Sequence, residues 1–438
     1  MNTKLHNKMM VTRTRVSIFS RLASVALIGG VVTTGIAGPG KEKAETENVS
    51  RDRVRLEIFS GLDLSLLLKV EAEALKKLHH AIDVDDNLKI GLALTIENKE
   101  RVVFINVKPA NNKGLDEGKL NAGLEHLKGL TVLRDLSLNN TKVSNAGLEH
   151  LKRVPTLERL HLNDTKVSDA GLEHLKGLAA LEELYLHKTK VSGSGLGHLK
   201  RLPALQRLVL GHTQVNDASL KHIAGGFPAL KILYLQGTQV SDAALKHLKG
   251  LSALSVLYLH NTKVRDAGLK HLREMPALTL LTLGNTEVSD AGLEHLRRLP
   301  ALSVLDLSNT QVSDAALKHL RVLPALSRLT LNNTKVSDVG LEHLKGLPAL
   351  RELSLRNTKV NDAGLGHLKG LPALKKLDLS ETQVGDAGLE ILMGMPALVV
   401  NLSNTNVNEA KFDKQIPRDA VGFFHVKHLL ENRKEKKD

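Results

Sequence analysis

Two hydrophobic patterns alternate along the chain from about residue 120 onward. Residues 347–370, with the sequence LPALRELSLRNTKVNDAGLGHLKG, are a typical unit. Leu353 and Leu355 alternate with polar residues, as in a half-buried strand. Leu365 and Leu368 follow an Asn-Asp pair that can cap a helix, and a Gly and a Pro then break that helix. Each unit is therefore predicted to form one strand and one short helix.

A threonine recurs at one place in each unit, and its spacing measures the repeat. Successive threonines lie 24 residues apart, except for one interval of 25 and one of 23. A fixed period of this kind is typical of a repeat architecture. We expect the hydroxyl to bond the backbone of the adjoining coil while the methyl group packs inside. The threonines are Thr141, Thr165, Thr189, Thr213, Thr238, Thr262, Thr286, Thr310, Thr334, Thr358, Thr382 and Thr405.

The strand and the helix of each unit together define the architecture. The strands of successive coils should pair in parallel at about 4.8 Å. Because helices are bulkier than strands, the stack should bend with its strands inside. We therefore predict an α/β solenoid, a horseshoe of about 12 coils of 24 residues. Its parallel sheet forms the concave face and its short helices form the convex face.

The repeated residues also resemble a known family. The pattern LxxLxLxxTxV resembles the leucine-rich-repeat family, with threonine where most members have asparagine. Together with the following DAGLxHL, it is similar to bacterial leucine-rich-repeat proteins of the ribonuclease-inhibitor-like group. The resemblance covers about residues 120–408. It implies the horseshoe fold, but it leaves the partner undefined because members of the family bind many different partners.

Composition supports a layered core and excludes the kinds of site that need cysteine. Aromatic residues make up 2% of the chain and Trp is absent, so leucine must supply most of the core. The chain has no Cys, which excludes disulfides, thiolate metal sites and a cysteine nucleophile. The formal net charge of +14 modestly favours acidic partners.

The first 40 residues have the order of an export signal. Residues 1–21 are basic, residues 22–40 carry no charge, and small residues around Ala37 fit a cleavage site. We predict a signal peptide over residues 1–37 and a secreted, periplasmic or cell-envelope location in a bacterium, with no membrane insertion after cleavage. The alternative is an anchor formed by an uncleaved N-terminal helix, although the apolar run is rich in Gly and Thr and suits a spanning helix poorly.

The open ends of a repeat stack expose leucines and need caps. Phenylalanine gathers in the regions beyond the repeats, at Phe59, Phe104, Phe423 and Phe424. The pattern of residues 101–107 also predicts a strand there. The expected domains are a linker (38–53), an N-terminal cap with a degenerate first coil (54–120), the leucine-rich repeats (121–408), and a C-terminal cap with a charged tail (409–438).

The residues that alternate with the strand leucines should line the concave face. All three tyrosines of the chain occupy one such position. Four consecutive coils carry an aliphatic residue at the other such position, two residues earlier in the strand. Charged residues flank these four coils on both sides. The predicted partner-binding residues are Tyr185, His187, Ile232, Tyr234, Val256, Tyr258, His260 and Leu280.

Apolar anchors surrounded by charged residues are typical of a protein-binding surface. The sequence therefore predicts a non-catalytic scaffold that captures a protein partner on its concave face, with no small-molecule substrate and no cofactor. The scaffold is expected to be a monomer. The competing explanation is drift at a permissive strand position, where β-branched residues simply suit a strand.

Two other functions compete with protein capture. The positive charge supports binding of an anionic polymer, either an acidic polysaccharide or a nucleic acid. Against it, glutamates interleave with the lysines, and the concave face lacks a basic groove or a stacking platform. An intracellular ubiquitin-ligase-type substrate adaptor is the other alternative, because such receptors carry similar repeats. The chain shows no recruitment domain, and its N-terminus indicates export.

Eleven histidines recur in register within the predicted helices. A row of imidazoles could bind metal or sense pH, but a metal site needs several converging ligands. A residue repeated in every coil favours a structural role, with a bond to the backbone of the next coil, and no metal site is predicted. Catalysis is not expected either, since Ser, His and Asp belong to the repeating unit and no GxSxG, phosphate-loop or HExxH motif occurs. The histidines are His126, His150, His174, His198, His222, His247, His271, His295, His319, His343 and His367.

Overall fold

A computed structural model describes residues 73–75, 77–78, 91–97, 101–108, 116–395 and 398–408. The predicted signal peptide (1–37), linker (38–53) and C-terminal cap (409–438) lie outside the described residues. The described residues all belong to one compact unit, Arg55–Asp438.

One sheet of 14 strands runs through the described residues in sequence order. The first two strands are antiparallel, and every later strand pairs in parallel with the one before it. The strands are β1 (Gly91–Glu97), β2 (Arg101–Lys108), β3 (Asp135–Ser137), β4 (Arg159–His161), β5 (Glu183–Tyr185), β6 (Arg207–Val209), β7 (Ile232–Tyr234), β8 (Val256–Tyr258), β9 (Leu280–Thr282), β10 (Val304–Asp306), β11 (Arg328–Thr330), β12 (Glu352–Ser354), β13 (Lys376–Asp378) and β14 (Val399–Asn401). The strand expected at residues 101–107 is β2.

Short helices follow the strands from β2 to β13. The α-helices are α3 (Glu117–Gly123), α4 (Asn145–Glu149), α5 (Asp169–Leu172), α6 (Leu196–Leu199), α7 (Asp217–Leu220), α8 (Asp242–Leu245), α9 (Asp266–Leu269), α10 (Asp290–Leu293), α11 (Asp314–Leu320), α12 (Asp338–Leu344) and α13 (Asp386–Met393). The 3-10 helices are η2 (Leu124–Gly129), η3 (His150–Arg153), η4 (Glu173–Leu175), η5 (Lys270–Glu274), η6 (Glu294–Arg298) and η7 (Asp362–Gly370). Each helix is therefore between one and three turns long.

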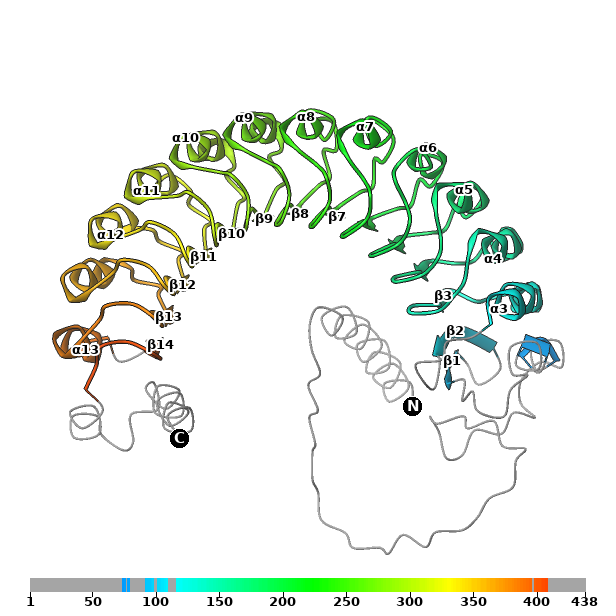
Figure 1. The fold of residues 1–438 in the computed structure, drawn as a ribbon, viewed down its shortest axis with the longest axis horizontal. Helices are drawn as coiled ribbons and strands as arrows, with labels where there is room; N and C mark the ends of the chain where they lie inside the picture. The colour runs from blue at the N-terminus through cyan, green and yellow to red at the C-terminus, as the bar shows by residue number, and fades with distance from the viewer. Residues whose placement is uncertain are drawn as a thin grey trace, which may run out of the picture. The chain divides into compact units, whose positions relative to one another are not determined.

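The repeat array curves with its strands on the inner edge and its helices on the outer edge (Figure 1). This arrangement confirms the predicted solenoid, with a parallel sheet on the concave face and short helices on the convex face. No helix among the described residues is long and apolar enough to cross a membrane.

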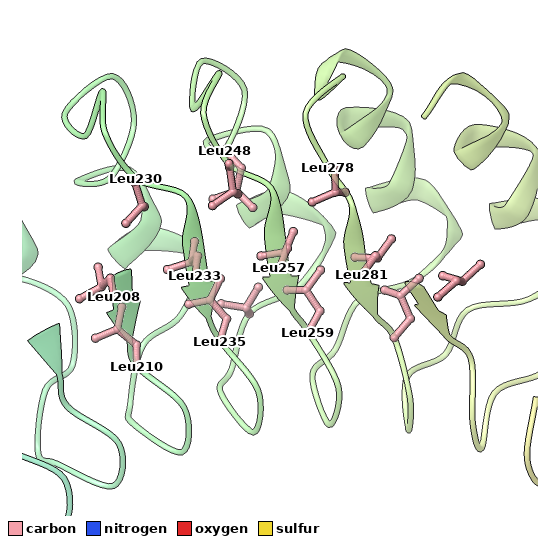
Figure 2. Packing of buried hydrophobic residues seen from close by; sticks show 14 of the residues in the cluster. Leu208, Leu210, Leu230, Leu233, Leu235, Leu248, Leu257, Leu259, Leu278 and Leu281 are labelled. Atoms are coloured by element: carbon pink, nitrogen blue, oxygen red, sulfur yellow. The ribbon is translucent and has the colours of Figure 1, made fainter. Parts of the chain in front are cut away.

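The core lies between the sheet and the helices and consists almost entirely of leucine. Leu233, Leu257 and Leu281, one from each of three neighbouring strands, are fully buried. Figure 2 shows these leucines stacked in register from coil to coil. Phe227 is 1% exposed and belongs to the same core, where it follows the one-residue insertion in its coil. The burial of identical residues at one period explains why the sequence pattern alone could identify the fold.

The repeated threonines close the turn that follows each strand. In all twelve coils the Oγ1 atom donates to a leucine carbonyl three residues earlier, as in Thr310 to Leu307 at 2.6 Å. The expected bond to the adjoining coil is therefore wrong, because the hydroxyl reaches the backbone of its own coil. Each threonine is buried, so it satisfies a carbonyl that water cannot reach.

Thr310→Val is expected to lower the free energy of unfolding by about 1–3 kcal/mol, because the buried carbonyl of Leu307 loses its donor. Thr310→Ser keeps the donor and removes only a methyl group, so its loss should be smaller, about 0.8 kcal/mol. Urea unfolding followed by circular dichroism measures both values. A greater loss for the serine variant would show that packing, and not the hydrogen bond, makes this position important.

Aspartates at the helix starts join neighbouring coils. Asp290 accepts from the backbone N–H of Ser313 at 2.7 Å and from its hydroxyl at 2.5 Å. The predicted Asn cap is present at Asn361, which accepts from the N–H of Ala363 at 2.9 Å. At Ser313, however, the side chain bonds back to Asp290 and does not cap its own helix. The helix starts therefore stabilise the stack between coils more than they stabilise single helices.

Candidate functional site

The strand register arranges the concave residues in two rows that cross the sheet. The first row contains the residue before the first strand leucine: Asp135, Arg159, Glu183, Arg207, Ile232, Val256, Leu280, Val304, Arg328, Glu352 and Lys376. The second row lies two residues further along each strand: Ser137, His161, Tyr185, Val209, Tyr234, Tyr258, Thr282, Asp306, Thr330, Ser354 and Asp378. Residues far apart in the chain thus become direct neighbours.

An apolar and aromatic surface occupies the middle of these rows. We call it the central patch and define it as Ile232, Tyr234, Val256, Tyr258, Leu280 and Val304, from β7 to β10. All of its members except Tyr234 are half-buried. Tyr234 and Tyr258 stack face to face, with ring centroids 4.2 Å apart and planes 7° apart. The patch includes five of the eight residues predicted to bind a partner.

Tyr234 is less accessible than the sequence suggested. It is 8% exposed, whereas the prediction placed it facing solvent. Its ring lies against Tyr258, and its hydroxyl accepts from the guanidinium of Arg207 at 3.3 Å. Burial raises the pKa of Tyr234 to about 12, and the neighbouring Tyr258 raises it further while Arg207 opposes the shift. The phenol is therefore neutral, and its ring supports the half-buried ring of Tyr258.

Tyr185 and His187 lie apart from the central patch. Val209 of β6 separates Tyr185 from Tyr234 in the second row. Tyr185 stacks on His161 at 4.3 Å, and its hydroxyl donates to Glu183. His187 packs edge-on against His212, with ring centroids 4.9 Å apart. The eight predicted residues therefore form two groups on one face, not one surface.

His260 borders the central patch. Its Nδ1 lies 3.1 Å from the hydroxyl of Thr282, and its ring meets that of Tyr258 edge-on at 6.3 Å. Burial lowers the pKa of His260, so the imidazole is neutral at physiological pH. A neutral histidine next to two stacked tyrosines extends the patch without adding a charge.

Charged residues on each side of the central patch pair across the strands. On the N-terminal side Arg159 lies 2.7 Å from Asp135, and Arg207 lies 3.2 Å from Glu183. We call these four residues the N-terminal ladder. The pairing of these charges was not predicted, although the alternation of their sign at the repeat spacing indicates it.

A second set of ion pairs borders the C-terminal side. Glu352 accepts from Arg328 at 2.7 Å and from Lys376 at 3.1 Å. These three residues form the C-terminal ladder. The hydrogen bond from Arg328 is the main cause of the lowered pKa of Glu352. Since the charges in both ladders alternate in sign, the concave face offers no continuous groove of one charge.

The eleven repeated histidines, His126 to His367, form a histidine ladder on the helical, convex side of the coils. Nine of its eleven members are half-buried, and His198 and His222 are exposed. The expected bond to the backbone of the next coil is wrong for the described residues: the Nδ1 of His295 contacts a guanidinium nitrogen of Arg273, and the Nδ1 of His174 is buried without a partner. No group of three or more His, Asp or Glu residues in the described part of the chain is arranged to hold a metal ion.

Lowering the pH from 7.5 to 5.5 is expected to destabilise the protein. In the folded state burial first, and then a neighbouring Lys or Arg, lower the pKa of His174, His247, His271, His295 and His319. The unfolded chain, with histidine near 6.5, then binds more protons than the folded one. Stability should therefore be complete above pH 6.5 and fall as the pH drops below it.

The urea midpoint at pH 7.5, 6.5 and 5.5 measures this loss, because the carboxylates titrate only at lower pH. A variant with glutamine at these five histidines is the control, and its midpoint should change less over the same range. An equal pH dependence in both proteins would contradict the histidine explanation.

Comparison with known proteins agrees with the geometry of the coils. Two family models described as leucine-rich repeat match residues 324–384 and residues 155–176, which together are less than half of the chain. No curated protein matches the chain.

Solved structures with the same kind of fold cover more of the chain. A leucine-rich-repeat protein of Leptospira interrogans is 20% identical, with a TM-score of 0.52 over 65% of this chain and 69% of its own. The mouse RP105/MD-1 complex is 19% identical, with a TM-score of 0.50 over 61% and 46%. An internalin, InlF of Listeria monocytogenes, is 21% identical over 72% and 88%, with a TM-score of 0.49. The first two similarities show the leucine-rich-repeat fold.

Proposed function

We propose that the chain is a non-catalytic scaffold that captures a protein partner on the central patch of its concave face. The observation that carries the proposal is the continuity of this patch across four neighbouring strands, between two ladders of opposite charges. Apolar and aromatic anchors inside a charged border are typical of protein interfaces. Tyrosine is among the residue types most often found at the energetic centre of such interfaces.

The side chains of the central patch are preorganised for binding. Tyr234 and Tyr258 support each other by stacking, and Arg207 holds the hydroxyl of Tyr234. The side chains therefore lose little conformational freedom when a partner covers them, which favours affinity. The ladders supply direction and specificity, since their charges need matching groups on the partner.

Sequence features support a cellular location and a family group for this scaffold. We place it outside the cytoplasm because residues 1–37 have the order of a signal peptide, and we assign residues 121–408 to the repeats. The DAGLxHL pattern supports a place in the ribonuclease-inhibitor-like group of bacterial leucine-rich-repeat proteins.

Salt dependence tests the chemical class of the partner. The scaffold is immobilised, proteins are captured from an extract of the source cells, and the affinity of each captured protein is measured between 50 and 500 mM salt. A partner held by the central patch should lose less than about threefold in affinity, because apolar contacts are not screened. A steep fall would show that charged groups, and not the central patch, hold the captured protein, and it would contradict the proposal.

A further inference from the structure

A row of cations follows the convex side of the middle coils, behind the central patch. The row runs along the helical segments of five coils, on α11, η5 and η6 and in the residues that follow α7, α8 and α11. We call it the basic strip: Lys221, Lys246, Lys249, Lys270, Arg273, Arg297, Arg298, Lys318 and Arg321. Eight of these side chains are exposed, and Arg273 is half-buried. The helices that carry them pack against one another in chain order. The charges therefore form one continuous surface feature.

The middle coils differ in charge from the coils at each end. The N-terminal coils place a glutamate three residues before a lysine, and the two side chains pair, as in Glu125–Lys128 at 2.7 Å and Glu173–Lys176 at 3.1 Å. In four of the five middle coils a lysine replaces that glutamate, at Lys221, Lys246, Lys270 and Lys318. The replacement removes the compensating charge and creates the excess.

The anions near the basic strip are two exposed glutamates and the half-buried aspartates that begin helices α7 to α11, whose carboxylates accept hydrogen bonds from the next coil. Glu274 pairs with Lys249 at 2.7 Å, and Glu294 lies in a shallow hollow together with Arg273, Arg297 and Arg298. Within the described residues Arg297 makes no ion pair, and the Nε of Arg273 is buried without a hydrogen-bond partner. Three guanidinium groups around one hollow are suited to bidentate contacts with carboxylate or sulfate groups.

From this surface we infer a second binding site on the convex face, for a linear acidic polysaccharide. The strip carries one or two cations in each coil, and neighbouring helix axes are on the order of 10 Å apart. A polymer with an anionic group on regularly spaced sugars can neutralise several of them at once. Because a flexible polysaccharide can follow a convex arc, it can contact all five coils (Figure 1).

The strip suits nucleic acids less well. The three tyrosines all belong to the concave face, Phe227 is buried and the chain has no Trp, so among the described residues only the small rings of histidines such as His222 lie next to the strip, and they offer bases a smaller stacking surface than Tyr or Trp. A stiff duplex would touch a convex surface over only a few coils. The geometry therefore favours a flexible polyanion without bases.

The test measures binding of the full chain to dextran sulfate, with uncharged dextran of the same length as the control polymer. The strip variant carries Lys246→Gln, Lys270→Gln, Arg297→Gln and Lys318→Gln. The matched variant removes the same number of charges outside the strip, with Lys128→Gln, Lys152→Gln, Lys176→Gln and Lys345→Gln. Unfolding curves establish that both variants remain folded.

The wild type should bind dextran sulfate and not dextran. The strip variant should lose at least about tenfold in affinity, and its slope of log affinity against log salt should fall by up to about 3. The matched variant should change by less than about twofold. Equal losses of affinity in the two variants would show that binding depends only on the net charge of the protein, and this would overturn the proposed site. Tighter binding of single-stranded or duplex DNA than of dextran sulfate at equal charge would also overturn it.

Discussion

Replacing Tyr234 and Tyr258 together with alanine is expected to weaken capture of the partner at least about a hundredfold. Tyr258 lies at the middle of the interface, where single truncations typically cost about 2 kcal/mol or more, and the buried ring of Tyr234 supports it by stacking. The two losses need not add, because the rings stack on each other at 4.2 Å and share one environment. Titration of a captured protein against the wild type and the double variant measures the change.

Tyr185→Ala provides the matched control. Tyr185 is the same residue type in the same row, but it lies two strands away and stacks on His161. Its loss should weaken capture by less than about fivefold, as expected for a residue near the rim. Tyr234→Phe with Tyr258→Phe keeps the stack and should retain most of the affinity. If Tyr185→Ala weakened capture as much as the double variant, the partner would bind nearer to β5 than the central patch is.

Leu257→Ala is expected to lower the free energy of unfolding by about 3 kcal/mol, within a range of 2–5. Leu257 is fully buried between the leucines of the two neighbouring strands (Figure 2). In a repeat stack each coil contacts only its neighbours, so the cavity cannot be filled by rearrangement elsewhere. Urea unfolding and amide hydrogen exchange measure the total loss and its spread along the array.

Val256→Ala tests whether this loss is specific to the core. Val256 precedes Leu257 in β8, but it faces the concave surface and is half-buried. Its removal should cost less than about 1 kcal/mol in stability, because little buried area is lost. It should instead weaken partner capture. A loss of stability as large as that of Leu257→Ala would show that the concave residues serve the fold and not a partner.

The basic strip and the central patch belong to the same middle coils but lie on opposite faces. Because the array is thin, a protein held by the sheet and a polysaccharide held by the helices need not exclude each other. The Tyr234 and Tyr258 variants should leave dextran sulfate binding unchanged, and the strip variant should leave protein capture unchanged. The two proposals can therefore fail independently.

Local periodicity determined the fold. A leucine at a fixed place in each coil must be buried by the same leucine of its neighbours, so the repeat spacing already implies parallel strands, short helices and a layered core. The concave rows also follow from the sequence, because side chains alternate across a strand. Hydrogen-bond partners were less predictable: the threonine hydroxyl reaches Leu307 in its own coil at Thr310, whereas Asp290 reaches the next coil at Ser313.

Tertiary structure decided which concave residues act together. By sequence alone Tyr185, Tyr234 and Tyr258 are equivalent, because each occupies the same place in its coil. The repeat alignment already places Val209 between the first and the other two, but only the stacked coils show that Arg207 and Tyr258 cover Tyr234. The sequence by itself thus determined the repeating scaffold, whose contacts recur at one period. Which side chains of the concave face are accessible to a partner depended on contacts between coils, because these side chains differ from coil to coil and cover one another.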